Sequence, residues 1–121
     1  MKIGILCACA PEFEPYRSAL GGDTAFIHGM QRTDGVLCGH EISAVFCGIG
    51  KVNAALGAMT LIRDCGADRI IMSGVAGAIR RGVHIGQCIM ITDCIYHDLS
   101  PQLITDYHPS GIAPDFLCEK D

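Results

Sequence analysis

Short runs of hydrophobic residues alternate with polar and glycine-containing segments along the chain, and this pattern predicts strands and helices in turn. Residues 2–9 are almost all apolar, which is typical of a central strand covered on both faces. Pro11 and Glu12 then favour the first turn of a helix, and Gly21-Gly22 favours its end. The chain is therefore expected to open with a buried strand and a helix.

Three shorter apolar runs come next, and they predict an antiparallel meander. The runs cover residues 24–30, 35–38 and 42–47. Turn signals at Thr33-Asp34-Gly35 and Gly39-His40 separate them, because these residue types favour hairpin turns.

The clearest helical pattern lies between residues 51 and 65, where apolar residues recur at spacings of three and four. Strands are predicted at residues 69–72 and 88–92, and we expect Met59 of the helix and Met72 of the first of these strands to lie in the core. The helical stripe consists of Val52, Ala55, Leu56, Met59 and Ile62. These elements predict one compact α/β or α+β domain.

Composition narrows the possible classes of protein. Half of the residues are hydrophobic and 18% are charged, yet no run approaches the roughly 18 apolar residues of a membrane-spanning helix. The formal net charge is −4, and no Lys/Arg cluster larger than Arg80-Arg81 is present to attract nucleic acid. We therefore expect neither a membrane protein nor a nucleic-acid-binding protein.

Eight cysteines raise the question of disulfides or a metal site. The first apolar run is too short for a secretory signal of roughly 15 to 30 residues, so we expect a cytoplasmic protein whose thiols are reduced and mostly buried. A zinc site can be drawn from Cys7, Cys9, Cys94 and His97, but no Cys-x-x-Cys or histidine pair supports it, and no metal is expected. The cysteines are Cys7, Cys9, Cys38, Cys47, Cys65, Cys88, Cys94 and Cys118.

The turn Gly48-Ile49-Gly50 precedes the predicted helix and raises the possibility of a phosphate-binding loop. A P-loop requires a glycine at position 45 and a serine or threonine after Lys51, whereas the chain has Val45 and Val52. A dinucleotide-binding turn requires a third glycine where Asn53 stands. A plain strand-to-helix turn and a ligand-binding helix N-terminus remain open.

Small residues also follow two other predicted strands, at Ala8-Cys9-Ala10 and at residues 74–77. Small residues let the backbone approach a ligand, and ligands of open α/β sheets bind at the carboxyl ends of strands. The three strand ends together favour a cleft for a small molecule.

Four motifs in this order, spread over nearly the whole chain, carry a family resemblance. They are residues 1–5 with Glu12 after them, residues 48–55, Ser73-Gly74-Val75-Ala76-Gly77 and Tyr96-His97-Asp98. The chain resembles the N-terminal half of the 5′-methylthioadenosine/S-adenosylhomocysteine nucleosidases, within the nucleoside phosphorylase family. The resemblance implies a three-layer α/β fold with a mixed central sheet flanked by helices, of which residues 1–121 form the N-terminal part.

The resemblance also implies a reaction: hydrolysis of the N-glycosidic bond of such nucleosides, releasing adenine for methionine salvage, without cofactor or metal. Glu12 matches the glutamate that activates the attacking water, a role that suits a carboxylate beside a ribosyl cation-like transition state. From the residues alone, a glutamate in a helix's first turn is more simply explained by the helix dipole.

The resemblance places other residues around the substrate. Ala8, Cys9 and Ile49 fall at the sugar and alkylthio group, while Val75, Ala76 and Gly77 fall at the purine and ribose. Val75 stands where many members carry a serine that helps to hold the water, and Cys9 stands where methionine is common. Valine cannot donate that hydrogen bond, and the pocket around the sulfur substituent is expected to differ.

Phosphate-using relatives hold the anion with Gly-Asp-Pro and an arginine after the first strand. This chain has Cys9-Ala10-Pro11-Glu12 instead, and the carboxylate would repel phosphate, so water is the expected nucleophile. The alternatives are a related phosphorylase or nucleosidase acting on another base, and a non-catalytic nucleoside-binding module.

The resemblance leaves parts of the site outside these 121 residues. The aspartate that activates the purine and the glutamate that binds the ribose belong to a C-terminal half, so the chain alone is expected to be inactive. The apolar loop at residues 99–117 belongs in the family to a dimer interface, and a homodimer of the complete protein is expected.

Overall fold

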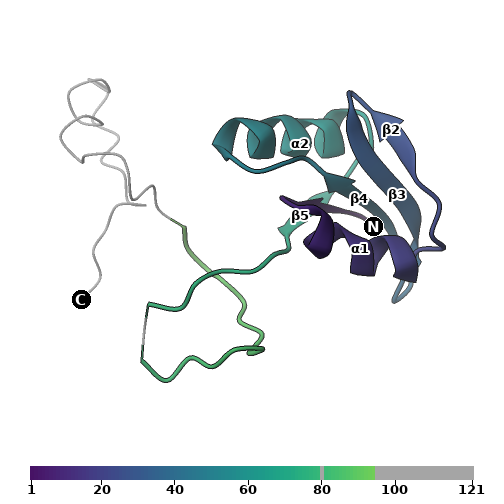
Figure 1. Cartoon of the computed structure of the whole chain (residues 1–121). Helices are drawn as coiled ribbons and strands as arrows, with labels where there is room; N and C mark the ends of the chain where they lie inside the picture. The colour runs from purple at the N-terminus through teal and green to yellow at the C-terminus, as the bar shows by residue number, and fades with distance from the viewer. Residues whose placement is uncertain (80, 95–121) are drawn as a thin grey trace, which may run out of the picture. The chain divides into compact units, whose positions relative to one another are not determined.

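The computed structural model describes residues 1–79 and 81–94, which belong to two compact units, Met1–Gly77 and Ala78–Asp121 (Figure 1). The helices and strands of the described residues all lie in the first unit. In chain order they are β1 (Lys2–Cys7), α1 (Ala10–Ala19), β2 (Ala25–Ile27), β3 (Met30–Leu37), β4 (His40–Phe46), α2 (Lys51–Arg63) and β5 (Arg69–Met72).

The strands form a mixed sheet in the order β2-β3-β4-β1-β5. β1 pairs in parallel with β4 on one side and with β5 on the other, which confirms the predicted central strand. β2, β3 and β4 pair antiparallel, which confirms the predicted meander.

The two hairpin turns differ in part from the prediction. They lie at His28-Gly29 and Cys38-Gly39, where all four residues have positive φ angles of 49° to 80°, as two-residue turns between twisted strands require. Thr33-Asp34-Gly35 is wrong as a turn, because these residues lie inside β3 and pair with residues of β4.

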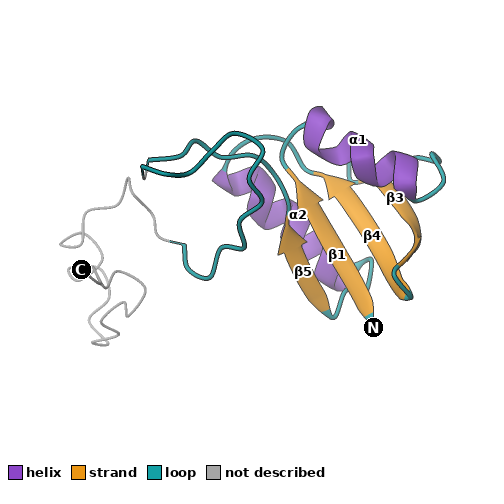
Figure 2. Ribbon diagram, turned by 90° about the horizontal axis from the view of Figure 1, so that it is seen from below, coloured by secondary structure: helices purple, strands orange, loops and turns teal. Residues whose placement is uncertain are grey.

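The two helices cover opposite faces of the sheet, as Figure 2 shows. Alternate residues of the central strand serve the two faces: Ile5 packs in a cluster with Phe13 of α1, and Leu6 packs in a cluster with Leu61 of α2. Both clusters lie at the centre of the sheet, where β1 and β4 are buried. The predicted three-layer α/β fold with a mixed central sheet is confirmed.

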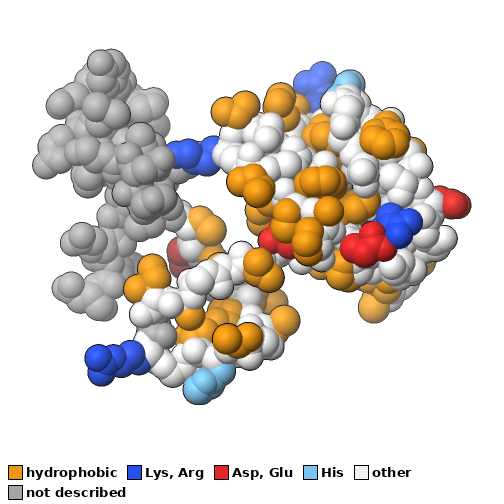
Figure 3. Space-filling view, viewed as in Figure 1, with side chains coloured by type: hydrophobic (Ala, Val, Ile, Leu, Met, Phe, Trp, Pro, Cys, Tyr) orange, Lys and Arg blue, Asp and Glu red, His pale blue; other side chains and the backbone are white. Residues whose placement is uncertain are grey.

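α2 packs on the sheet through a different face from the one predicted. Its sheet side consists of small residues and Leu61, and a Cβ added at Gly57 would lie 2.6 Å from Cys47 Cβ and Leu6 Cδ1. The helix therefore approaches the sheet closely at Gly57, and the larger apolar stripe points away from it. Val52, Leu56, Met59 and Ile62 are each at least half exposed. Exposed hydrophobic side chains are visible on this unit in Figure 3.

Met59 and Met72 are therefore not core residues, which corrects the prediction. Met72 is the last residue of β5, which in the described part of the chain pairs only with β1. One edge of β5 and much of its surface consequently have no neighbouring strand among these residues.

The described residues of the second unit, 78–79 and 81–94, contain no helix or strand. The predicted strand at residues 88–92 is thus wrong, because no ladder of hydrogen bonds joins it to another described strand and Ile89, Met90 and Ile91 are exposed. Tyr96-His97-Asp98, the loop at residues 99–117 and Cys118 lie outside the described residues.

No described helix is both long enough and apolar enough to cross a membrane. None of the seven cysteines in the described ranges forms a disulfide. Cys7, Cys47 and Cys65 are buried, but Cys38, Cys88 and Cys94 are exposed. The expectation that most thiols are buried is therefore wrong, because three of these cysteines lie in a hairpin turn or in segments without regular structure.

Candidate active site

The carboxyl ends of the three parallel strands meet at one edge of the sheet. Backbone hydrogen bonds continue the pairing beyond the strands, from Cys47 N–H to Cys7 C=O at 3.0 Å and from Ser73 N–H to Leu6 C=O at 3.0 Å. The segments that follow β1, β4 and β5 therefore leave the sheet at the same edge, where open α/β sheets bind ligands.

Glu12 lies at this edge and joins two of the three segments. Its Oε2 accepts hydrogen bonds from Ala8 N–H at 2.9 Å and Cys9 N–H at 3.2 Å. Its Oε1 accepts a hydrogen bond from Val75 N–H at 3.0 Å. The carboxylate is thus held by backbone donors on both sides, after β1 and after β5.

The local sequence explains why Glu12 reaches these donors. Cys9 is the extended N-cap residue of α1, and Glu12 is the third residue of the helix, from which a glutamate reaches back to the N-cap N–H in a capping box. Pro11 fits the first turn because that position needs no N–H donor. Glu12 therefore stabilises the start of α1 through these capping hydrogen bonds, and in doing so it lies at the sheet edge.

Gly74 makes room for the carboxylate. A Cβ at this position would lie 2.5 Å from Glu12 Oε1 and 2.9 Å from its Cδ, closer than non-bonded atoms approach. Any other residue at position 74 would require the carboxylate or the backbone after β5 to move.

The surroundings keep Glu12 ionised. The hydrogen bond from Val75 N–H lowers the pKa of Glu12 most strongly, partial desolvation opposes this, and Ala8 and Cys9 add smaller lowering effects. Burial raises the pKa of the neighbouring Cys7 thiol to about 12 and also raises that of Cys47, with the charge of Glu12 adding to both. Near neutral pH these two thiols are uncharged, and the negative charge of this group resides on Glu12.

A second contact between α1 and the segment after β5 joins Ser73 of the family motif to Tyr16, a residue that the sequence analysis did not single out. The hydroxyl groups of Tyr16 and Ser73 share a hydrogen bond of 2.6 Å. Tyr16 lies four residues after Glu12, one turn along the same helix face. That spacing is the one sequence signal that could have associated Tyr16 with the site.

The other residues proposed from the resemblance are brought to the same edge. Ala8, Cys9 and Val75 contact the Glu12 carboxylate through their N–H groups. Ile49 is exposed in the turn between β4 and α2, where its carbonyl accepts a 2.8 Å hydrogen bond from Asn53 Nδ2. Ala76 and Gly77 directly follow Val75 and are exposed.

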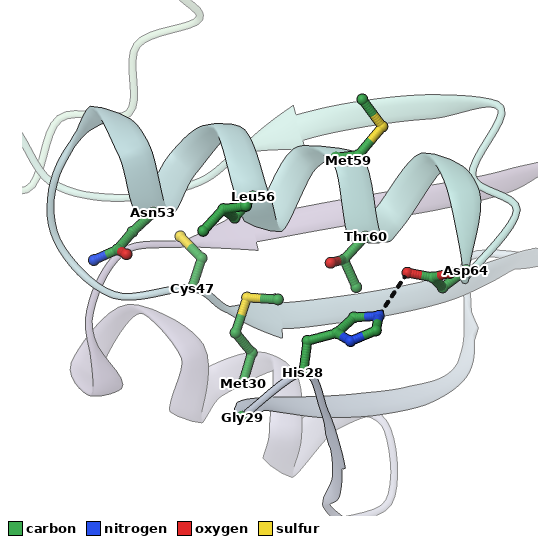
Figure 4. A pocket seen from close by; sticks show the side chains of 9 residues that line it. All are labelled: His28, Gly29, Met30, Cys47, Asn53, Leu56, Met59, Thr60 and Asp64. Carbon is green, nitrogen blue, oxygen red and sulfur yellow. Dashed lines mark hydrogen bonds and ion pairs between the residues drawn. The ribbon is translucent and has the colours of Figure 1, made fainter.

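A pocket of about 470 Å³ lies elsewhere, between α2 and the β2–β3 turn (Figure 4). Met30, Cys47, Leu56 and Met59 contribute to its lining, and His28 Nε2 contacts Asp64 Oδ2 at 3.0 Å at one end. None of the site residues proposed from the sequence lines it. Within the described residues, no three His, Cys, Asp or Glu side chains are grouped so that they could hold a metal ion.

Comparisons with known proteins show the family to which the chain belongs. Residues 2–119 match the family model of the phosphorylase superfamily. The 5′-methylthioadenosine/S-adenosylhomocysteine nucleosidase of Bacillus cereus (strain B4264) is 31% identical over 100 residues, which cover 82% of this chain and 43% of that protein. The chain spans about half of the length of the curated relatives that it matches, from 43% for this Bacillus cereus protein to 54% for that of Bacillus cytotoxicus.

Solved structures with the same fold include proteins described as 5′-methylthioadenosine/S-adenosylhomocysteine nucleosidases and as futalosine hydrolases. The S. pneumoniae methylthioadenosine/S-adenosylhomocysteine nucleosidase with a transition-state inhibitor gives a TM-score of 0.67 at 32% identity, covering 71% of this chain and 38% of that one. A futalosine hydrolase mutant of Helicobacter pylori gives a TM-score of 0.62 at 31% identity, and the match covers 70% of this chain and 38% of that one. Because its sequence matches the family model and its fold matches these structures, the chain belongs to the phosphorylase superfamily and is similar to its 5′-methylthioadenosine/S-adenosylhomocysteine nucleosidases.

Proposed function

We propose that the complete protein hydrolyses the N-glycosidic bond of 5′-methylthioadenosine and S-adenosylhomocysteine and releases adenine, as a step of methionine salvage in the cytoplasm. Residues 1–121 would form the N-terminal part of its nucleoside phosphorylase-type α/β domain. The family match and the similarity to nucleosidases of this specificity support the proposal.

In this proposal Glu12 orients and deprotonates the attacking water. Within the described residues, Oε1 accepts one backbone N–H bond, from Val75, and so retains an acceptor position for a water hydrogen. The water oxygen bonds to the anomeric carbon as the C–N bond to adenine breaks. The electron pair of that bond leaves with adenine, and a proton of the water passes to the carboxylate. The ionised Glu12 would also stabilise the positive charge that develops on the ribose.

Six other residues would line the substrate. We propose that Ala8, Cys9 and Ile49 contact the sugar and the alkylthio group, and that Val75, Ala76 and Gly77 contact the purine and the ribose. Their shared position at the carboxyl edge supports this assignment. Val75 has no side-chain hydroxyl, but its backbone N–H orients Glu12 directly.

One observation carries the choice of water over phosphate. The N–H groups of Ala8 and Cys9, between β1 and α1, are both bonded to the Glu12 carboxylate. Free N–H groups at the start of a helix attract anions, but these two already have an anionic partner. A phosphate ion would have to displace the Glu12 carboxylate, which like phosphate is negatively charged.

The proposed nucleophile predicts that phosphate has no effect on turnover. The complete protein should release adenine from 5′-methylthioadenosine at equal rates with and without phosphate, with free 5-methylthioribose as the other product. Chromatography of the products checks this. A sugar 1-phosphate as the main product would show that the protein is a phosphorylase.

An alternative within the same chemistry is hydrolysis of another nucleoside, and the similarity to a Helicobacter pylori futalosine hydrolase favours keeping it. Comparing kcat/KM for methylthioadenosine, S-adenosylhomocysteine and futalosine would decide between these substrates. Tight binding of all three without turnover would instead support a nucleoside-binding module.

We also propose that the complete protein is a homodimer, on the basis of the resemblance alone, since residues 99–117 lie outside the described part. Sedimentation velocity of the active protein should give a dimer across the micromolar range. A fully active monomer whose sedimentation does not change with concentration would contradict this.

A further inference from the structure

The segment after β5 is attached to α1 at two points, one helical turn apart. Glu12 accepts the Val75 N–H bond, and Tyr16, four residues later, shares its hydroxyl hydrogen bond with Ser73, two residues before Val75. Both contacts lie on the face of α1 that points towards the sheet, where Tyr16 packs against the core cluster of Phe13. The tyrosine hydroxyl therefore sits at a fixed point of the helix.

The position of the Val75 N–H depends on few other contacts. Ser73 N–H extends the ladder to Leu6, but Gly74 has no side chain to pack, and Val75 is 88% exposed. A glycine gives this backbone wide freedom of rotation. Among the described residues, the Tyr16–Ser73 hydrogen bond is thus the last side-chain contact before Val75, apart from the bond between Val75 N–H and Glu12 itself.

We propose that Tyr16 and Ser73 are positioning residues, whose hydrogen bond holds the Val75 N–H against Glu12 and thereby sets the orientation of the carboxylate. The inference rests on the proposed function, in which Glu12 activates water. Neither hydroxyl is assigned to contact the substrate.

The proposal has a consequence for acidity. Val75 N–H makes the largest contribution to the lowered pKa of Glu12, so loosening this donor should raise the pKa. Among the described residues, the Glu12 carboxylate interacts with the Cys9 side chain through a hydrogen bond and with the Cys7 and Cys47 thiols through its charge. The raised pKa of Cys7 and of Cys47 keeps both thiols uncharged in the acid range. A shift of the acid limb of the pH–rate profile to higher pH would therefore indicate a raised pKa of Glu12.

The test compares Tyr16→Phe and Ser73→Ala in the complete protein with Ser73→Thr, a conservative variant that keeps a hydroxyl group at position 73. Ser18→Ala is the matched control, because it removes a hydroxyl of the same helix that contacts Glu14 instead. We expect each of the first two variants to lower kcat roughly 2- to 10-fold with little change in KM, as for loss of one hydrogen bond. The acid limb should move up by about 0.5 pH unit.

Further comparisons separate positioning from general stability. The Tyr16→Phe/Ser73→Ala double variant should be no worse than the more affected single variant, because both changes remove one interaction. Ser73→Thr and Ser18→Ala should both keep the acid limb of the pH–rate profile at its wild-type position. A lowered melting temperature with an unmoved limb in both Tyr16→Phe and Ser73→Ala would overturn the proposal.

Failure of the proposed function can be told apart from failure of this inference. The Glu12 carboxyl can be titrated by ¹³C NMR in the same proteins, with its signal assigned through Glu12→Gln. If the wild-type protein hydrolyses no nucleoside but Tyr16→Phe raises the Glu12 pKa, the positioning role stands and the proposed reaction falls. If the enzyme is active and Tyr16→Phe and Ser73→Ala leave the Glu12 pKa unchanged, the positioning role falls.

Discussion

Glu12→Gln in the complete protein should lower kcat by about 10²-fold or more, as expected for loss of a general base. The amide cannot accept the proton of the attacking water. Its NH₂ group would also face the Val75 N–H on one side or the Ala8 and Cys9 N–H groups on the other, where the carboxylate offered acceptors. Nucleoside affinity should change much less than turnover, and single-turnover kinetics with a binding titration measure the two separately.

Glu14→Gln is the matched control for this variant. Glu14 lies on the same helix, but its carboxylate pairs with Arg17 at the surface, so its loss should leave kcat near the wild-type value. In the wild-type protein, turnover should fall only as the pH drops through the lowered pKa of Glu12, because the ionised form is the active one. If Glu12→Gln turned over substrate as fast as the wild-type protein, Glu12 would have no part in the mechanism.

Gly74→Ala should lower kcat by about 10²-fold by a different route, because small displacements of a catalytic group have effects of this size. The new methyl group would lie 2.5 Å from Glu12 Oε1, so either the carboxylate turns away or the Val75 N–H is withdrawn from it. Both movements disturb the group that holds the water. Steady-state kinetics, together with the pKa of Glu12 measured by NMR, checks this outcome.

Gly57→Ala separates crowding at the site from crowding in general. Its Cβ would also be too close to its neighbours, at 2.6 Å from Cys47 Cβ and Leu6 Cδ1, but on the face of the sheet that α2 covers. Overpacking there should cost about 1–3 kcal/mol of unfolding free energy, partly offset by the better helix propensity of alanine. Its kcat should fall far less than that of Gly74→Ala. Equal losses of kcat in the two variants would contradict a specific role for Gly74.

The layer arrangement could be predicted where local patterns and tertiary packing agree. The buried run at residues 2–9 corresponds to β1, whose two faces are both covered, and Pro11 and Glu12 lie in the first turn of α1 as expected. The family motifs placed Glu12 and Val75 in one site, and the structure joins them by a hydrogen bond across 63 residues of sequence.

The errors arise where packing, rather than local pattern, decides the structure. Thr33-Asp34-Gly35 has turn-forming residues, but pairing along the whole of β4 keeps it in β3. On α2, the larger apolar stripe is exposed because the helix meets the sheet through small residues around Gly57. The Tyr16–Ser73 contact joins residues 57 positions apart, and no local pattern of either residue predicts it.

The most direct test of the account follows the oxygen atom of the nucleophile. The complete protein should be given 5′-methylthioadenosine in ¹⁸O-labelled water containing phosphate, and the sugar product analysed by mass spectrometry, alongside Glu12→Gln. We predict free adenine and methylthioribose that carries the label at its anomeric carbon, formed at least about 10²-fold more slowly by the variant. Unlabelled sugar 1-phosphate, or labelled sugar formed equally fast by Glu12→Gln, would contradict the claim that Glu12 activates water at this sheet edge.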